Sequence, residues 1–271
     1  MVKTIHVMKE EPRITVIMGI YNCADTLVEA LGSLEAQTYK RFKVVLCDDG
    51  SKDNTLEVAQ KWTETHPNYI VIRNEHNIKL AATLNHCLDY ADTEYVARMD
   101  GDDISLSTRF EKEIDFLDKH SEYALVSCPM IYFDEKGDYL IGKSLAEPTK
   151  EYFANGVPFC HAPVMMRRNI LEAIGRYTAE PKVERAEDYY LWYKFYKNGH
   201  KGYNLSEPLY KMRNSRDAFG RRHFSDRWRT YKLGIEVKKS LGLKHPYVTG
   251  LKGLVKGLVP SWLVCYIKTR R

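Results

Sequence analysis

Apolar positions follow two different periods along the first hundred residues. Short apolar runs rich in β-branched residues, typical of buried strands, occur at 14–18, 44–47, 69–72 and 95–99. Between them, apolar residues recur at helical spacing over 27–34, 56–62 and 81–88. Strands separated by such helices pair in parallel through right-handed crossovers. The pattern predicts an α/β fold with a Rossmann-like, mainly parallel central sheet flanked by helices.

Beyond this region the pattern becomes mixed. Residues 130–142 are typical of a hairpin that turns at 135–138, and residues 186–196 predict a helix with Leu191, Trp192 and Phe195 on one face. Past Arg213 the chain is predicted to be mainly helical and basic.

Polar side chains follow each of the predicted parallel strands, where such sheets bind their ligands. Tyr21 and Asn22 follow the first strand, Asp48 and Asp49 the second, and the polar run 74–77 the third. The fourth is followed by the acidic run 100–103. We therefore expect a ligand site at this edge of the sheet.

The run 100–103 places three carboxylates, Asp100, Asp102 and Asp103, within four residues. Such a repulsive cluster needs a counter-charge if it is partly buried, and a divalent cation would supply one. Hard oxygen ligands favour Mg²⁺ or Mn²⁺, which keep positions open for substrate phosphates. The alternative is an acidic turn that caps the helix near Ser107.

Two further acidic pairs are weaker signals. The carboxylates of Asp48 and Asp49 can accept a nucleobase N–H or a ribose hydroxyl, although Asp-Gly is also a common turn. The pair Glu187–Asp188 opens a predicted helix, where acidic residues also occur for electrostatic reasons alone.

Charge divides the chain into two parts. Residues 213–271 hold 15 Lys and Arg against 3 Asp and Glu, a net charge of +12. Because the whole chain has a net charge of +5, residues 1–212 carry a net charge of −7. A basic segment suits anionic lipid, phosphate or nucleic acid, or is simply a solvated face. An acidic body suits metal-assisted chemistry on phosphates.

Neither a signal peptide nor an apolar run long enough to span a membrane is predicted. The six cysteines are scattered, which favours reduced thiols in the cytoplasm. The chain has no Gly-x-Gly-x-x-Gly motif, so the main sequence evidence for a dinucleotide-dependent dehydrogenase is missing.

Five segments in this order resemble family-2 glycosyltransferases of the GT-A fold, particularly the bacterial enzymes of surface-polysaccharide assembly. The similarity covers about residues 13–215 and rests on the segments 14–22, 47–53, 97–104, 161–167 and 187–188. It implies a GT-A catalytic domain over 1–215, with a nucleotide-sugar-binding half at about 13–105 and an acceptor half at about 106–215. Residues 216–271 would form a helical, basic appendage.

The resemblance implies a role for each matching residue on the donor side. Tyr21 would pack on the nucleobase, Asp49 would contact the base N–H, and Asp48 would be a supporting neighbour. Uridine is the expected base. Asp100 would lie near the ribose or the metal shell.

It also implies that Asp102 ligates a Mn²⁺ or Mg²⁺ ion that bridges the diphosphate, and that Asp188 is the catalytic base. His161 and Glu187 are the candidates on the acceptor side. The expected reaction is metal-dependent hexosyl transfer with inversion, from a nucleotide-diphosphate donor to a hydroxyl of a glycan or lipid-linked acceptor.

Two positions depart from the family pattern. Gly19 stands where a proline is usual, and Lys79 replaces a common glycine. These departures leave the nucleotide and the sugar of the donor open.

The C-terminal segment has the pattern of an interfacial amphipathic helix. Its apolar residues recur at helical spacing and lysines flank them, yet the segment is too short to span a membrane. The apolar positions are Tyr247, Leu251, Leu254, Val255, Leu258 and Trp262. We expect a peripheral protein on an anionic cytoplasmic membrane face; the alternative is a helix packed on the catalytic domain.

Three rival functions remain open. A sugar nucleotidyltransferase would share the sheet and the metal but would need a glycine-rich loop near its start. A non-catalytic module that binds nucleotide sugars or glycans would not need Asp188. A nucleic-acid binder would explain the basic tail but not the acidic strand ends, so we expect no nucleic acid as partner.

Overall fold

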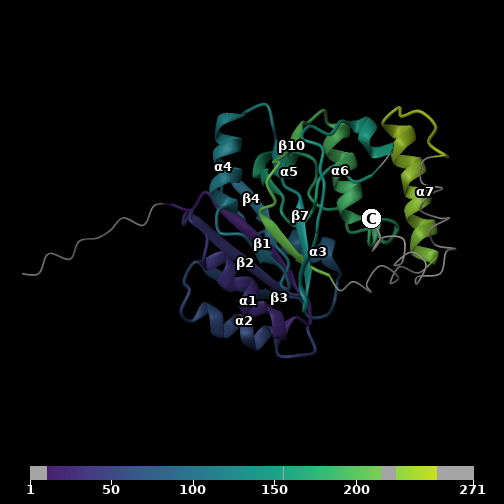
Figure 1. Ribbon diagram of the computed structural model, residues 1–271. Coiled ribbons are helices and arrows are strands. Elements are labelled where there is room, and N and C mark those ends of the chain that lie inside the picture. The colour runs from purple at the N-terminus through teal and green to yellow at the C-terminus, as the bar shows by residue number, and fades with distance from the viewer. Residues whose placement is uncertain (1–10, 155, 215–223, 249–271) are drawn as a thin grey trace, which may run out of the picture.

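A seven-stranded sheet lies at the centre of the computed structural model, which describes residues 11–154, 156–214 and 224–248 (Figure 1). Its strand order is β10-β6-β9-β4-β1-β2-β3. These strands are β1 (Ile14–Ile20), β2 (Phe42–Asp48), β3 (Tyr69–Arg73), β4 (Tyr95–Arg98), β6 (Leu125–Ser127), β9 (Met165–Arg167) and β10 (Gly202–Asn204).

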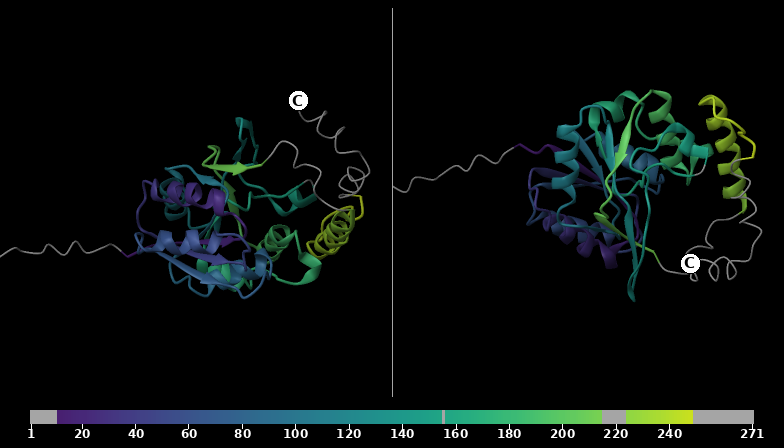
Figure 2. Two further views of the ribbon diagram at one scale, coloured as in Figure 1. Left: turned by 90° about the horizontal axis from the view of Figure 1, so that it is seen from below. Right: turned by 45° about the horizontal axis from the view of Figure 1, so that its top comes forward.

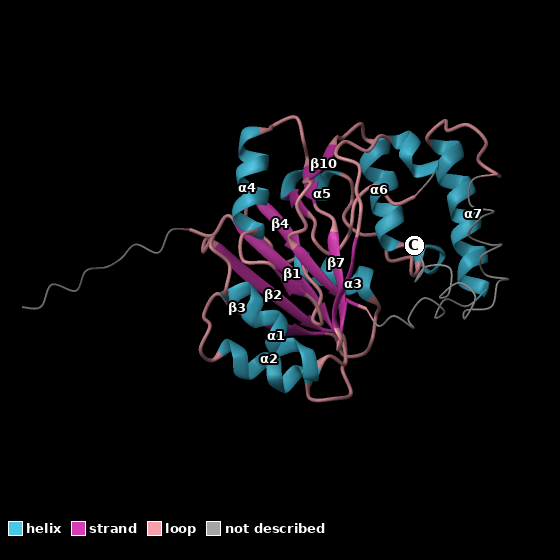
Figure 3. Cartoon of the chain, in the orientation of Figure 1, coloured by secondary structure: helices cyan, strands magenta, loops and turns pink. Residues whose placement is uncertain are grey.

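Helices cover both faces of this sheet (Figure 3). They are α1 (Ala24–Glu35), α2 (Thr55–Thr63), α3 (Leu80–Leu88), α4 (Arg109–Lys119), α5 (Arg168–Ala173), α6 (Glu187–Lys197) and α7 (Phe224–Ser240). Two short 3₁₀ helices, η1 (Lys150–Ala154) and η2 (Pro181–Val183), lie in the loops.

Strand β1 pairs in parallel with β2 on one side and with β4 on the other, and β2 pairs in parallel with β3. The four strands therefore end at one edge of the sheet. The predicted parallel α/β core is confirmed. Alternate residues of β1 pack on opposite faces: Val16 belongs to the cluster under α1 and α4, whereas Ile17 belongs to the cluster under α3 and α6.

Helix α1 shows why these segments are helical. Its buried residues Leu27, Ala30, Leu31 and Leu34 recur at spacings of three and four, which places them in one stripe facing the sheet.

Strand β9 interrupts the parallel arrangement. It lies between β4 and β6 and runs antiparallel to both. The sequence pattern did not predict it, because three residues are too few to establish a strand period. Its position joins the strands before residue 105 to those after it.

A second sheet of order β5-β11-β7-β8 lies against the acidic run. Its strands are β5 (Ile104–Ser105), β7 (Met130–Asp134), β8 (Gly137–Ile141) and β11 (Tyr210–Arg213). Strands β7 and β8 form the predicted hairpin. Strand β11 pairs in parallel with β7 and antiparallel with β5, which begins one residue after Asp103. Two distant parts of the sequence therefore meet beside that run.

Helix α7 packs beside α6, on the side of the molecule away from α1 and α2 (Figure 2). Leu233, Val237 and Leu241 are buried there, and the hydroxyls of Tyr193 and Ser240 lie 2.8 Å apart. The helical, basic character predicted beyond Arg213 is thus present in α7.

The predicted amphipathic helix at the C-terminus lies mostly outside the described residues, which end at Val248. Within the described ranges, no helix is both long and apolar enough to cross a membrane.

Candidate active site

The predicted donor residues lie along the edge where β1, β2 and β4 end. Tyr21 directly follows β1, Asp49 directly follows β2, and Asp100 lies two residues beyond β4. The register aligns Ile20 with Asp48, so the two loops start at the same level. The side chain of Tyr21 is 42% exposed, which leaves its ring accessible to a ligand.

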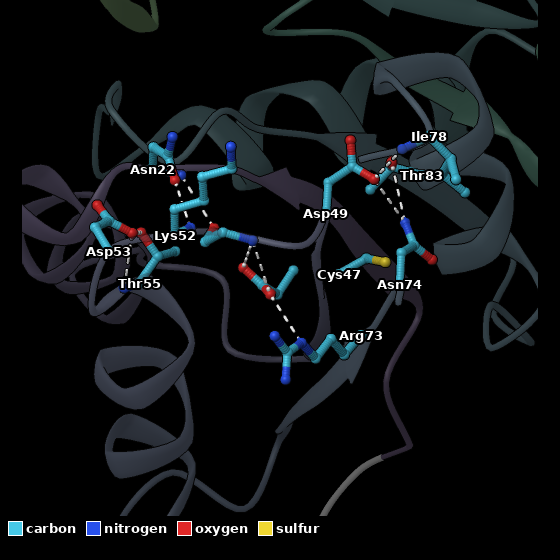
Figure 4. Close-up of polar contacts among 12 residues, drawn as sticks. Asn22, Cys47, Asp49, Lys52, Asp53, Thr55, Arg73, Asn74, Ile78 and Thr83 are labelled. Atoms are coloured by element: carbon cyan, nitrogen blue, oxygen red, sulfur yellow. Dashed lines mark hydrogen bonds and ion pairs between the residues drawn. The ribbon is translucent and has the colours of Figure 1, made fainter. Parts of the chain in front are cut away.

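Hydrogen bonds join the loop after β1 to the loop after β2 (Figure 4). The backbone N–H of Asn22 donates to Ser51 Oγ at 3.0 Å, and Asn22 Oδ1 accepts from the N–H of Lys52 at 2.8 Å. Asp53 similarly accepts from the Thr55 hydroxyl and N–H. These contacts fix the backbone that carries Tyr21.

Asp48 and Asp49 have different surroundings. Asp48 is fully buried, accepts from the N–H of Ser51 and lies 3.5 Å from Arg73 Nε, so it stabilises the turn. Asp49 is 4% exposed and accepts three N–H groups: Asn74 Nδ2 at 2.9 Å and the backbone of Ile78 at 2.9 Å on Oδ1, and the backbone of Lys79 at 3.1 Å on Oδ2. A carboxylate offers about four acceptor positions. Asp49 therefore retains room for one further donor.

Asn74 has a larger part in this loop than the sequence suggested. Its amide donates to Asp49 and to the Thr83 hydroxyl (Figure 4). Its oxygen lies 2.7 Å from Nδ1 of His86. Only its place directly after β3 could have indicated a role. Asn74 holds the carboxylate of Asp49 in one orientation.

Two glycines are required by close packing in these loops. Gly50 has a φ of +70°, and a Cβ there would lie 2.9 Å from the backbone of His76. A Cβ on Gly101 would lie 2.8 Å from Sγ of Cys23. A larger residue at position 50 would displace the loop backbone, and one at position 101 would force the Cys23 side chain to shift.

The three carboxylates of the acidic run have three different environments. Asp100 accepts from Arg98 Nη2 at 2.5 Å. Asp103 is buried and accepts from the backbone N–H of Arg213 at 2.8 Å. Asp102 is exposed, and its carboxylate has no hydrogen bond or ion pair with any residue that the structure describes.

Protein cations supply part of the counter-charge that we expected from a metal alone. Arg98 is buried on β4 beneath Asp100. Arg213 comes from β11; its Nε donates to the backbone oxygen of Asp102, and its Nη2 is also paired with Glu29. Arg213 could not be assigned to the site from the sequence because it lies 110 residues from Asp103. Arg98 was not predicted either, because charged residues inside apolar strands are rarely buried.

These residues fit a cation that is shared with a substrate rather than enclosed by the protein. In the described parts of the chain, no three His, Cys, Asp or Glu side chains converge as a complete metal site. Mg²⁺ and Mn²⁺ are commonly held by one or two carboxylates plus substrate phosphates. Asp102 reaches the surface, but the loops around its carboxyl remove part of its hydration; this desolvation, followed by the charge of Asp100, raises the pKa of Asp102 above its ordinary value. A bound cation would offset both effects.

His161 is one of the two residues predicted to lie near the acceptor. Its Nε2 lies 2.9 Å from the hydroxyl of Tyr177, and its ring contacts Trp192 edge-on. Burial, together with the charge of Arg98, holds the pKa of His161 well below its ordinary value. The imidazole is therefore neutral at pH 7 and is better suited to positioning than to supplying charge.

Glu187 and Asp188 form the first turn of α6, and Asp188 Oδ1 accepts from the N–H of Tyr189 at 2.7 Å. Burial raises the pKa of Tyr177; Arg98 opposes this effect, while Glu187, Asp100 and Asp188 add to it. The Tyr177 hydroxyl thus lies within electrostatic reach of both the acidic run and the start of α6. The structure brings these two predicted groups to one region.

Asn85 on α3 connects the two halves of the site. Its Nδ2 donates to the backbone oxygen of Tyr177 at 2.9 Å, and its Oδ1 accepts the backbone N–H of Tyr177 at 3.0 Å. The helix that follows the donor loops is therefore tied directly to the segment that leads into α6.

A cavity of about 240 Å³ lies between the start of α3 and the segment 178–187. Lys79 and Leu80 lie on one wall, and Val183, Glu184 and Glu187 lie on the other. The cavity adjoins the backbone that binds Asp49 and ends beside the first turn of α6.

Residues 15–175 match the family model described as Glycosyl transferase family 2. The chain belongs to glycosyl transferase family 2. The family predicted from the five segments is thereby confirmed.

Among relatives of this family 2 glycosyltransferase is the glycosyltransferase EpsE of Bacillus subtilis, which is 40% identical over 263 residues, covering 94% of this chain and 92% of EpsE. Another is the UDP-Glc:alpha-D-GlcNAc-diphosphoundecaprenol beta-1,3-glucosyltransferase WfaP of Escherichia coli. It is 27% identical over 202 residues, covering 73% of this chain and 77% of WfaP.

Solved structures confirm the GT-A fold of this family 2 member. S. aureus TarS 1–349 in complex with UDP superposes with a TM-score of 0.68 at 21% identity, over 91% of this chain and 70% of TarS. The mannosyltransferase PcManGT of Pyrobaculum calidifontis, in complex with GDP-Man and Mn²⁺, gives a TM-score of 0.62 at 19% identity, over 97% and 81% of the two chains.

The buried carboxyl of Asp103 makes the stability of this glycosyltransferase depend on pH. Burial and the charges of Asp100 and Asp102 raise the pKa of Asp103 to about 8. Because the folded state holds the proton more tightly than the unfolded state, this contribution to stability is present at low pH and is lost as pH rises towards 8. We expect the free energy of unfolding, measured in urea with chelator, to fall between pH 5 and 8 with a slope of up to about 1.4 kcal/mol per pH unit from this group.

Asp103→Asn is the control, because its amide oxygen can still accept the N–H of Arg213 while the titrating group is gone. The pH slope should become shallower in this variant. An unchanged slope would assign the pH dependence to another group.

Proposed function

We propose that this chain is an inverting, metal-dependent glycosyltransferase. It transfers a hexose from a nucleotide-diphosphate donor, with UDP as the expected nucleotide, to a hydroxyl of a glycan or lipid-linked acceptor in polysaccharide biosynthesis. The observation that carries this proposal is the arrangement around Tyr177. Asp100 from the acidic run and Glu187 and Asp188 from α6 all act electrostatically on its buried hydroxyl, and the carboxylate of Asp102 makes no hydrogen bond or ion pair with a described residue.

The donor half supplies a surface for the nucleotide. The exposed ring of Tyr21 can stack on the base, and the remaining acceptor position of Asp49 suits a base N–H. Asp48 acts through the turn that it stabilises. Asp100, held by Arg98, would face the ribose or the metal shell.

Asp102 is the residue suited to hold Mn²⁺ or Mg²⁺. When bound there, the cation would stabilise the negative charge that develops on the departing diphosphate. Arg98 and Arg213 keep the neighbouring carboxylates in place, so Asp102 can turn towards the ligand. The Mn²⁺ in the PcManGT complex supports this role for the fold.

Asp188 is suited to accept the proton of the acceptor hydroxyl as that hydroxyl attacks the anomeric carbon. The attack comes from the face opposite the diphosphate, so an α-linked donor would give a β-glycoside. His161 and Glu187 would help to position the acceptor. The beta-1,3 linkage in the name of WfaP supports this stereochemistry.

We also propose that the protein binds peripherally to an anionic membrane surface on the cytoplasmic face. Helix α7 carries Trp228 with 44% exposure, and Lys232 and Lys239 are exposed on the same helix. Tryptophan and lysine together favour the membrane interface. The lipid-linked acceptor in the name of WfaP supports such a location.

The test is a screen of nucleotide sugars with the purified full chain, in Mn²⁺ and in excess chelator, read by donor hydrolysis and by calorimetry. We expect one donor, a UDP-sugar, to be hydrolysed, and UDP to bind at least about 10-fold more weakly in chelator, because diphosphate and acidic run repel each other. Equal binding in both conditions would refute the metal role. Once an acceptor is identified, formation of an α-linked product from an α-linked donor would refute inversion.

A further inference from the structure

Lys79 occupies a backbone conformation that glycine adopts readily and other residues do not. Its φ is 75° and its ψ is 158°, directly before the first residue of α3. A side chain in this region of φ and ψ strains the backbone. Such strain persists only where the surrounding contacts impose it.

The contacts that impose this conformation are those with Asp49. The N–H of Ile78 donates to Asp49 Oδ1 and the N–H of Lys79 donates to Asp49 Oδ2, so two successive peptide groups converge on one carboxylate. A glycine at position 79 would make the same bond without strain. The backbone therefore explains the conformation but does not explain a lysine side chain.

The Lys79 side chain has no role within the protein that the structure describes. Lys79 is exposed, and its ammonium makes no hydrogen bond, ion pair or ring contact with a described residue. Lys79 is one of the residues that line the cavity between α3 and the segment 178–187. An ammonium group carries three donors, which a ligand in this cavity could satisfy.

The cavity restricts which ligand group would meet the ammonium. Three carboxylates, Glu180, Glu184 and Glu187, line the opposite wall and would repel an anion, and the one arginine there, Arg185, is already paired with Asp226. A neutral oxygen is therefore favoured over a phosphate. Asp49, which accepts a hydrogen bond from the backbone N–H of Lys79, is the proposed acceptor for the base N–H. The nucleoside is thus the part of the donor that lies nearest to Lys79.

We infer that Lys79 is a specificity-determining residue that donates a hydrogen bond to a neutral oxygen of the donor nucleoside, a base carbonyl or a ribose hydroxyl. This inference rests on the proposed function, because it requires a nucleotide beside Asp49. The role of the strained lysine would then be to select the donor nucleotide rather than to stabilise the fold.

Two substitutions separate the side chain from the backbone. Lys79→Ala removes the ammonium and keeps a Cβ in the strained conformation, whereas Lys79→Gly removes both. A charge-assisted hydrogen bond corresponds to roughly 10-fold in affinity or more, so both variants should bind UDP and uridine about 10-fold more weakly than the wild type. Calorimetry on the full chain with Mn²⁺ measures UDP, and competition measures uridine.

Thermal unfolding provides the second readout. Lys79→Gly should raise Tm by about 2–5 °C because it relieves the strain, and Lys79→Ala should not. The matched control is Lys61→Ala, an exposed lysine on α2 that should change neither the affinity nor Tm.

The outcomes distinguish this inference from the proposed function. Equal loss for UDP and uridine supports the contact with the nucleoside. Loss for UDP alone would place the ammonium on the diphosphate and overturn the assignment, as would wild-type affinity in Lys79→Ala. If the wild type does not bind UDP, GDP and guanosine replace the two probes; if it binds neither nucleotide, the proposed function fails and this inference fails with it.

Discussion

Replacing Asp188 by asparagine is expected to reduce sugar transfer by about 10²–10⁴-fold, the usual contribution of a positioned general base. Asparagine keeps the size of the side chain and can still accept the N–H of Tyr189. Asp188 is not among the residues proposed to hold the donor or the metal, so the dissociation constants of both should stay near the wild-type values. Transfer rates at saturating donor and acceptor, together with calorimetry of UDP, measure both quantities.

Glu187→Gln is the matched control, because it removes one negative charge from the same first turn of α6. Both variants should lose the same small stabilisation of the helix start, which equal shifts in Tm would show. In Glu187→Gln we expect a higher KM for the acceptor with kcat little changed. Wild-type transfer by a folded Asp188→Asn protein would place the base elsewhere.

Asp102→Asn is expected to lower donor affinity and turnover together, each by about 10-fold to 100-fold, since loss of a group that holds a metal costs at least that much. The reason is local: among the three carboxylates of the run, Asp100 and Asp103 are already bound by Arg98 and Arg213. Titration with Mn²⁺ should restore part of both quantities. Calorimetry of UDP at several Mn²⁺ concentrations provides the measurement.

Asp138→Asn is the control for Asp102→Asn. It also removes an exposed carboxylate, but one that is paired with Lys211 on the hairpin side of the second sheet. Its donor affinity and Mn²⁺ requirement should equal those of the wild type. If Asp102→Asn needs no additional Mn²⁺ to bind UDP normally, Asp102 does not hold the metal.

The parallel core could be predicted because its signals are local. Each strand of β1 to β4 is a run of apolar residues, and each connecting helix has its own apolar stripe, so a short window of sequence contains the information. Parallel pairing then places the strand ends together. Tyr21, Asp49 and the acidic run follow those ends directly, which is why their common location was predictable.

The other contacts of the site join residues that are far apart in the sequence. Arg213 reaches Asp103 across 110 residues, and Asn85 reaches Tyr177 across 92. No periodicity encodes such pairs. The different surroundings of Asp48 and Asp49 were equally hidden, because one is buried under the turn and the other faces Asn74 only after β3 has paired with β2.

The hydrogen bonds of Asn85 bear on how halves of related enzymes could be exchanged. Asn85 contributes its side chain, but its partner at position 177 contributes only backbone groups, which any residue other than proline provides. A chimera that joins residues 1–105 of this chain to the second half of a relative would retain Asn85 and could form both hydrogen bonds with the new backbone. The reverse exchange would keep these hydrogen bonds only if the incoming helix carried an asparagine at the place of Asn85.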